Sequence, residues 1–245
     1  MDRTWEEAGW EQLAPGVARR RLPGWDATAG LVQGTSGVLM VDAGATLREG
    51  AELRRQAQDL TGRGVTHLAL THPHFDHVLG APSFAGVEVY GAVGMDRMLG
   101  GPRRRAALRE DAVRHGVDPD AASEAAEQLV PPDHLVSGDM VVGLGGGREA
   151  VLVNVGPGHS GHDLVVLVPG HDGGPSVVFC GDLVEESGEP QAGPDAVPGQ
   201  WPAALDRLVA LGGEDALYVP GHGAVVDARF VRAQREELAA RFASG

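Results

Sequence analysis

The stretch THPHFDHVLGA, residues 71–81, constrains the fold of this chain more than any other feature. It places three histidines and one aspartate within six positions: His72, His74, Asp76 and His77. Imidazole nitrogens and carboxylate oxygens are the ligands that zinc and similar divalent metals bind, and three histidines this close together have few structural uses. The apolar run THLAL ends at residue 70, so residues 71–77 are predicted to form a loop at the carboxyl end of a buried strand, where α/β sheets bind ligands.

Three further polar residues follow strand-like runs later in the chain. GPGHSGHD supplies His159 after AVLVNV, FCGDLVE supplies Asp182 after SVVF, and VPGHG supplies His222 after LYV. Each of these is an ordinary turn sequence when taken singly. Together with the first stretch they make a set of five histidines and two aspartates at strand ends, which indicates a metal site assembled from distant parts of the chain.

Hydrophobic periodicity predicts one mixed α/β domain over residues 1–245. A hairpin is predicted over residues 30–44, a helix over 47–64, and two or three inserted helices around 94–130. Four strand-like runs, a helix, a strand and a closing amphipathic helix follow. The Gly- and Pro-rich segment 186–199 lies within this pattern and is predicted to be an active-site loop.

Charge and composition exclude several classes of partner. The formal charge is −14, from 20 basic and 34 acidic residues, which disfavours binding to nucleic acid or to an anionic membrane. The N-terminal residues lack the apolar stretch of a signal peptide, and no run of apolar residues is long enough to span a membrane, so a cytoplasmic protein with a small-molecule substrate is expected. Cys180 is the lone cysteine and is predicted to be a buried strand residue, which leaves histidines and carboxylates as ligands.

The motifs HxHxDH, GxGHS, GD and GHG, in that order, resemble the metallo-β-lactamase fold superfamily, and VLMVDAG at 38–44 resembles an early strand of that family. The resemblance covers almost the whole chain. It implies a four-layer αβ/βα sandwich with a dinuclear metal site that holds two zinc ions. The implied ligands of one metal are His72, His74 and His159, those of the second are Asp76, His77 and His222, and Asp182 is the implied bridge.

Such a site predicts a metal-dependent hydrolase. Five imidazoles and two carboxylates leave two divalent ions with enough positive charge to hold a bridging hydroxide at neutral pH, which would cleave an ester, lactone, thioester or amide-type bond. Asp76 is also a candidate proton carrier to the leaving group. Four other residues are candidates for hydrogen bonds to the ligand imidazoles or for contacts with substrate: Asp42, His162, Asp163 and Glu185.

Several alternatives stay open at this point. The same ligands accept iron or manganese, so an iron-dependent sulfur oxygenase is one alternative, and a phosphodiesterase or nuclease is another. Strong β-lactamase activity is not expected, because Glu185 stands where many cysteine-type relatives have a lysine and the chain has no lysine at all. Arg103, Arg104 and Arg105 are predicted to be a solvated helix start or a lid that contacts an anionic substrate group. The histidines outside the motifs are predicted to be surface or turn residues: His67, His115, His134 and His171.

Overall fold

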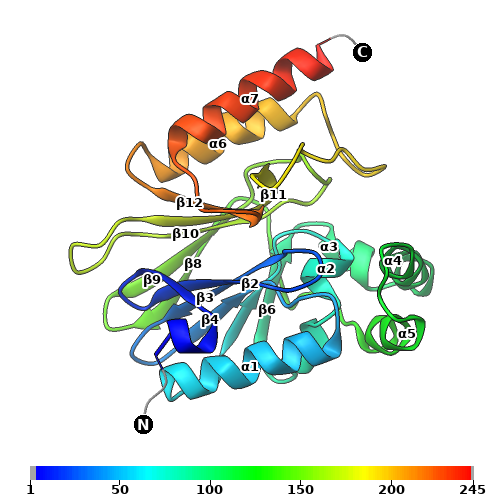
Figure 1. The fold of residues 1–245 in the computed structure, drawn as a ribbon, viewed down its shortest axis with the longest axis horizontal. Helices are drawn as coiled ribbons and strands as arrows, with labels where there is room; N and C mark the ends of the chain where they lie inside the picture. Colours follow the sequence, from blue (N-terminus) through cyan, green and yellow to red (C-terminus); the bar gives the residue numbers. More distant parts are fainter. Residues whose placement is uncertain (1–3, 244–245) are drawn as a thin grey trace.

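Two β-sheets pack face to face in the computed structural model, which describes residues 4–243, and helices cover the outer face of each sheet (Figure 1). The first sheet has seven strands in chain order: β1 (Glu11–Ala14), β2 (Val17–Arg21), β3 (Thr28–Gln33), β4 (Val38–Val41), β5 (His67–Ala69), β6 (Glu88–Ala92) and β7 (His134–Val136). The second sheet has five strands, in the order β12 (Leu217–His222), β11 (Val177–Glu185), β10 (Val165–Val168), β9 (Arg148–Val153) and β8 (Asp139–Gly145).

The helices lie in three places. On the outer faces of the sheets are α1 (Leu47–Thr61), α6 (Trp201–Gly212) and α7 (Ala228–Phe242). Between β6 and β7 are the inserted helices α3 (Met95–Leu99), α4 (Pro102–Arg114) and α5 (Pro119–Gln128). Short helical turns complete the set: η1 (Glu6–Ala8), α2 (Phe75–Val78) and η2 (Ala81–Phe84). Within residues 4–243, no helix combines the length and the apolar character needed to cross a bilayer.

Alternation of buried side chains along the strands produces four layers. On β4, Leu39 and Val41 point into the cluster between the two sheets, whereas Val38 and Met40 belong to the cluster under the outer helices. A third cluster lies between the second sheet and the helices α6 and α7. The central strands β4 and β10 are therefore buried on both faces and read as continuous apolar runs, whereas β8 alternates buried and exposed residues. The layers confirm the predicted αβ/βα sandwich.

Strand pairing differs between the two halves of the first sheet. β1 to β4 pair antiparallel, and β4 to β7 pair parallel. The predicted hairpin is confirmed as β3 and β4, and the inserted helices are confirmed as α3 to α5. The sequence did not predict β1, β2 or β7. β2 reads VARRR, and its three arginines do not give the apolar pattern of a strand. Arg19 can be buried in this strand because its guanidinium pairs with Glu11 at 2.7 Å.

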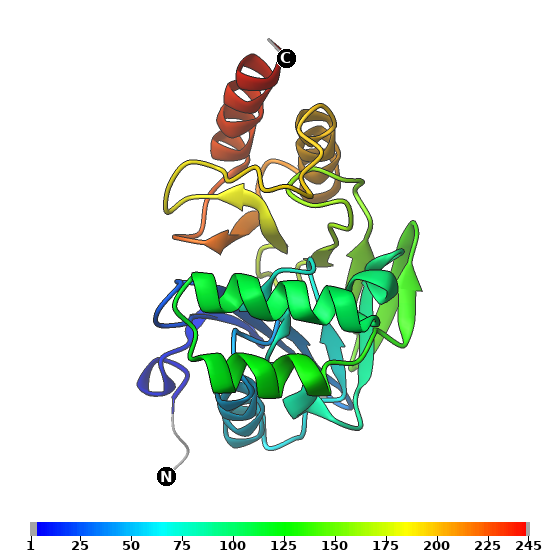
Figure 2. The same cartoon turned by 90° about the vertical axis from the view of Figure 1, so that its right-hand side faces the viewer.

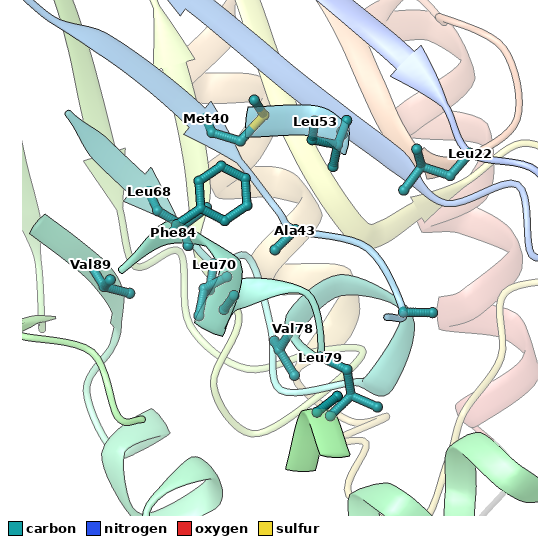
Figure 3. Close-up of a cluster of buried hydrophobic side chains, with 14 of the residues drawn as sticks. Leu22, Met40, Ala43, Leu53, Leu68, Leu70, Val78, Leu79, Phe84 and Val89 are labelled. Carbon is teal, nitrogen blue, oxygen red and sulfur yellow. The ribbon is translucent and has the colours of Figure 1, made fainter. Parts of the chain in front are cut away.

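The inserted helices form one side of the molecule and lie nearest the viewer in Figure 2. α4 and α5 pack against each other, and α4 also packs against α2, the helical turn within the histidine-rich stretch. Beneath that turn, Val78 and Leu79 belong to the same buried cluster as Leu70 and Phe84 (Figure 3). Ala43 also donates its backbone N–H to the carbonyl of His77 at 2.8 Å, so α2 is held from below by packing and by a hydrogen bond.

Candidate metal centre

The structure brings together all seven residues that the motifs single out. Their donor atoms form two groups, each with its atoms within 4.8 Å of one another: His72, His74, His159 and Asp182 in the first, and Asp76, His77 and His222 in the second. All seven are buried or half-buried. The grouping of histidines and of Asp76 is the one that the family resemblance implies.

Local structure at four of these positions differs from the sequence prediction. Residues 71–77 were predicted to be a loop, but the one-turn helix α2 begins at Phe75, and Asp76 and His77 lie in it. The turn forms because Val78 donates its backbone N–H to the carbonyl of His74 at 3.1 Å while Phe75 is buried. Asp182 lies inside β11 and His222 is the last residue of β12, so both strands are longer than their apolar runs.

Glycines next to Asp182 make room for the centre. A Cβ on Gly221 would lie 1.8 Å from Asp182 Oδ1, and a Cβ on Gly181 would lie 2.8 Å from the Cβ of Thr71. Gly181 also has a φ of 54°, which side-chain-bearing residues rarely adopt. The GD and GHG motifs therefore have a steric reason: glycine lets β11 approach the histidine-rich stretch, and it lets β12 approach Asp182.

Each of the five imidazoles has one ring nitrogen bound to an oxygen outside the cluster. The pairs are His72 Nδ1 with Thr71 Oγ1 (2.9 Å), His74 Nε2 with Asp195 (3.0 Å), His77 Nδ1 with Asp42 (2.8 Å), His159 Nδ1 with the Gln191 carbonyl (3.1 Å) and His222 Nδ1 with the Trp25 carbonyl (2.8 Å). An oxygen acceptor fixes the proton on the outer nitrogen and leaves the lone pair of the inner nitrogen free. The outer contacts therefore orient all five rings for coordination.

The inner nitrogens of His72, His77, His159 and His222 face Asp182, and the inner nitrogen of His74 lies 2.9 Å from that of His159. Asp182 Oδ1 lies 3.2 Å from His77 Nε2, and Oδ2 lies 3.5 Å from His72 Nε2 and 3.4 Å from His222 Nε2. Among the described residues, the buried Nε2 atoms of His72 and His77 and Asp182 Oδ1 lack hydrogen-bond partners. Buried polar atoms rarely stay unpaired, so this donor set fits divalent metal ions, with Asp182 in contact with both groups.

Charge at the second group is balanced by protons when no metal is bound. Burial opposes ionisation of Asp182, but His72, His77 and His159 hold its pKa well below the usual value. Burial lowers the pKa of His222, yet its hydrogen bonds to Asp182 and Asp76 outweigh this and raise the pKa to about 10. The pKa of His77 is likewise raised by the same two carboxylates against the effect of burial. A metal ion would replace these protons as the compensating positive charge.

Two histidines of the first group are in the form that binds metal at neutral pH. Burial lowers the pKa of His72 to about 4 and that of His159 to about 3, so both rings are neutral at pH 7. His74 differs from them: burial lowers its pKa, but the hydrogen bond to Asp195 and the charges of Asp195, Asp182 and Asp76 together raise it above the usual value. Burial opposes ionisation of Asp195 as well, but the same bond to His74 lowers its pKa to about 2.

We expect metal binding to release protons from this site. His222 is protonated at pH 7 in the metal-free protein because its pKa is about 10, and an imidazole must lose that proton to bind metal. The raised pKa also stabilises the metal-free fold below pH 6.5, and this contribution is lost as the pH rises from 6.5 through 10. Zinc titration calorimetry in buffers of different ionisation enthalpy would count the released protons, and thermal unfolding of the metal-free protein would show the loss of stability.

The control for this prediction is His134→Ala, because His134 lies on β7, outside both groups, and pairs with Glu88. This variant should release as many protons as the wild type, whereas His222→Ala should release fewer. Zinc binding at pH 7 without any proton release would contradict the expected charge balance.

The other site candidates from the sequence differ in where they lie. Asp42 accepts hydrogen bonds from Thr71 and from His77, both at 2.8 Å, so it touches a ligand imidazole. Asp163 accepts from the backbone N–H groups of Gly158 (2.9 Å) and Ser160 (3.1 Å), on either side of His159, and burial raises its pKa to about 7. These two aspartates hold the segments that carry the ligands.

The structure does not place His162 or Glu185 against the ligands in the same way. His162 Nδ1 lies 3.0 Å from the carbonyl of Val93. Glu185 is a neighbour of His222 in the β-ladder, but its carboxylate accepts from the backbone N–H (2.9 Å) and the hydroxyl (2.6 Å) of Ser187. Glu185 is also not among the residues that line the cavity, so its carboxylate does not add a charge to the cavity wall.

The loop 186–199 supplies contacts that the sequence did not predict. Asp195 and the carbonyl of Gln191 bind two imidazoles of the first group, and Val197 donates its N–H to the Gly158 carbonyl at 2.9 Å. Arg241 in α7 binds the Pro190 carbonyl at 2.9 Å. The Gly- and Pro-rich composition indicated an active-site loop, but no motif marks Asp195, and a backbone carbonyl has no sequence signal.

A cavity of about 640 Å³ opens over the two groups. Its floor includes His74, Asp76, His159, Asp182 and His222. The walls come from the loop 191–195, from Trp25 and Phe75, and from α4 with its C-terminal cap, His115. His115 was predicted to be a surface residue. It is exposed, but it also lines this cavity.

Comparison with known proteins agrees with this geometry. The family model of the metallo-beta-lactamase superfamily matches residues 22–222. The metallo-beta-lactamase domain-containing protein 1 of Xenopus laevis is 28% identical over 198 residues, which cover 81% of this chain and 71% of the relative. The structure is similar to the mono-zinc form of metallo-β-lactamase FIM-1 from Pseudomonas aeruginosa, with a TM-score of 0.70, 19% identity and 95% coverage of both chains.

A metallo-β-lactamase from Pontibacter korlensis is similar to the same extent, with a TM-score of 0.70, 20% identity, and coverage of 94% of this chain and 97% of that one. At these identities the solved structures establish the fold. The family model covers most of the chain, including all seven clustered residues, and it confirms the resemblance seen in the motifs. This protein therefore belongs to the metallo-β-lactamase superfamily.

Proposed function

We propose that the protein is a dinuclear zinc hydrolase that cleaves an ester, lactone, thioester or amide-type bond in a small molecule. The observation that carries this proposal is the orientation of the five imidazoles. Each has an outer nitrogen bonded to oxygen and an inner nitrogen aimed at Asp182 or at a neighbouring ring, at the floor of an open cavity. In this proposal one zinc is held by His72, His74 and His159, the other by Asp76, His77 and His222, and Asp182 bridges them.

Zinc ions bound there would supply a Lewis acid for the substrate carbonyl and would make water acidic enough to attack it at neutral pH. The chain offers no competing nucleophile in Cys180, because burial raises the pKa of this thiol, whose Sγ lies 3.3 Å from the Val178 carbonyl. Asp76 lines the cavity and its pKa is lowered by His77 and His222 against the effect of burial, so it is an ionised carboxylate that can accept a proton and pass it to the leaving group.

Two observations support zinc and a small substrate. The similar Pseudomonas structure is a mono-zinc form, and the donor set here is the nitrogen and oxygen set that zinc accepts. The cavity volume of about 640 Å³ suits a small organic molecule, and the charge of −14 argues against nucleic acid as the substrate. Metal analysis of protein purified without added metal tests the first point, since iron in place of zinc would favour sulfur oxygenation.

A hydrolysis panel tests the proposed reaction directly. Zinc-loaded wild type and His72→Ala would be compared on a lactone, a thioester, an aryl ester and a chromogenic β-lactam. Loss of a ligand from the first group should lower turnover of the best substrate on the order of a thousandfold, the size expected when stabilisation of the developing oxyanion is lost. The β-lactam should be the poorest substrate, because Glu185, and not a lysine, lies three residues after Asp182, so no cation at that position binds the carboxylate beside the β-lactam ring.

His134→Ala is the matched histidine control and should keep the wild-type rates, because His134 lies outside both groups. Asp76→Asn, with bound zinc measured alongside, separates proton transfer from metal binding: full turnover by this variant would rule out Asp76 as the proton carrier. If no substrate turns over faster with the wild type than with His72→Ala, the proposed hydrolase function is wrong for these bond types.

A further inference from the structure

The insertion α3 to α5 contributes part of the cavity wall above the metal centre. Met98 of α3 and Leu108, Arg104 and Arg114 of α4 line the cavity that the metal groups floor. α4 packs against α2, which carries Asp76 and His77, so this wall is fixed to the centre itself. Substrate bound with its reacting carbonyl at the metal groups would therefore extend along α4.

One face of this wall is formed by aromatic and apolar side chains that pack against one another. Trp25 and Phe75 meet edge to face with ring centroids 5.6 Å apart, and Phe75 stacks on His115 at 5.3 Å and 18°. The indole N–H of Trp25 also donates to the His115 carbonyl at 3.1 Å, so the end of α4 is tied to this aromatic row. Together with Met98 and Leu108, the row offers a surface for an aromatic or aliphatic group.

The charges that line the cavity are matched except for one arginine. Asp111 pairs with Arg114 at 2.6 Å, and Asp195 pairs with His74 at 3.0 Å. Asp76 and Asp182 contact the ligand imidazoles. Arg104 is exposed, lines the cavity, and forms no ion pair within residues 4–243. An unpaired guanidinium in a wall that is otherwise neutralised, on a chain of charge −14, is a local site of positive potential.

We propose that Arg104 binds an oxyanion at the end of the substrate remote from the cleaved bond. The preferred substrate is then an amphipathic acyl compound: its carbonyl lies at the metal groups, its apolar body lies along Trp25, Phe75 and Leu108, and its carboxylate or phosphate pairs with Arg104. The planar fork of a guanidinium binds either anion through two parallel hydrogen bonds. This inference rests on the proposed hydrolase function, and it assigns the substrate class of the same site.

The test compares charged and uncharged substrates that carry the same leaving group. Mono-4-nitrophenyl esters of succinate, glutarate and adipate would be measured beside neutral 4-nitrophenyl esters of equal chain length, on zinc-loaded wild type and Arg104→Ala. The ratio of kcat/KM for the best acid over its neutral counterpart should exceed one in the wild type and should fall about tenfold in Arg104→Ala, as expected for a hydrogen-bonded charge pair. An ester with a terminal phosphonate, included as a further arm, tells which oxyanion is preferred.

Arg103→Ala is the matched control, because Arg103 is exposed on the same turn of α4 but does not line the cavity. It should retain the wild-type ratio. Arg104→Lys keeps the charge without the planar fork and should give an intermediate ratio. A wild type without preference for any acid, or a preference that survives in Arg104→Ala, would overturn the inference.

A binding measurement separates this inference from the proposed reaction. If none of the esters is hydrolysed, the hydrolase proposal fails, and Arg104 is then tested by titration calorimetry with 4-phenylbutyrate and its uncharged amide. The acid should bind the wild type more tightly than the amide does, and Arg104→Ala should weaken binding of the acid about tenfold more than binding of the amide. Equal affinities of acid and amide, or an acid affinity that Arg104→Ala does not change, would show that Arg104 binds no anion.

Discussion

Asp182→Asn should leave a folded protein that has lost both its bound zinc and its turnover. The Asp182 carboxylate lies within 3.5 Å of inner nitrogens from both groups, and burial does not prevent its ionisation. An amide is uncharged and a poor metal ligand, so zinc affinity should fall by more than the roughly 10- to 100-fold that loss of a supporting hydrogen bond costs. Turnover of the best panel substrate should fall on the order of a thousandfold.

Zinc content after dialysis, circular dichroism and kcat/KM measure the three parts of this expectation. Asp139→Asn is the control, because Asp139 is exposed on β8 of the same sheet and lies outside both groups. It should keep its zinc and its rate. An Asp182→Asn protein that retains two zinc ions and full turnover would show that the ligand assignment is wrong.

Asp42→Ala should destabilise the protein and weaken zinc binding together. The buried carboxylate of Asp42 accepts three hydrogen bonds of 2.8 Å, from the N–H and hydroxyl of Thr71 and from His77. Alanine leaves these donors unpaired, so the free energy of unfolding should fall by about 3 to 5 kcal/mol. Loss of the bond that orients His77 should lower zinc affinity roughly 10- to 100-fold. Urea unfolding of the metal-free protein and zinc competition against a chelator measure the two effects.

Backbone conformation needs its own control here, because Asp42 has a φ of 60° and alanine tolerates this region poorly. Asp172 has a similar φ of 52° on an exposed turn away from the cavity, so Asp172→Ala should cost only about 1 kcal/mol and leave zinc affinity unchanged. Asp42→Asn keeps an oxygen acceptor and tolerates this backbone conformation. Its loss of unfolding free energy should therefore lie between the losses of Asp42→Ala and Asp172→Ala. An Asp42→Ala protein as stable as Asp172→Ala would contradict the role assigned to the three hydrogen bonds.

The ligand set could be predicted because its information is local. His72, His74, Asp76 and His77 are adjacent in sequence, and the other three follow apolar runs that any strand prediction finds. Most contacts that orient the imidazole rings could not be predicted from the sequence, because they depend on how loops distant in the chain pack against the site. The carbonyls of Gln191 and Trp25 bind His159 and His222, and carbonyls are common to every residue.

The cavity wall was only partly predictable for the same reason. Composition predicted the helices around 94–130, but not that Arg104 faces the cavity while Arg103 does not, because this depends on how α4 packs against α2. β2 was missed because three successive arginines do not read as a strand. Its buried Arg19 is tolerated only because Glu11 of β1 and the carbonyl of Gly223 accept its hydrogen bonds.

The attachment of the loop 186–199 determines how substrate can enter and leave. The loop is held by Arg241 at Pro190, by His159 at Gln191, by His74 at Asp195 and by Gly158 at Val197. It cannot swing outward without releasing two rings of the first metal group. The exposed end of α4 rests on Trp25 through one hydrogen bond and on Phe75 through one stacked pair, and neither of these contacts involves a ligand imidazole. Passage into the cavity would therefore proceed on the α4 side, with the loop as the stationary wall.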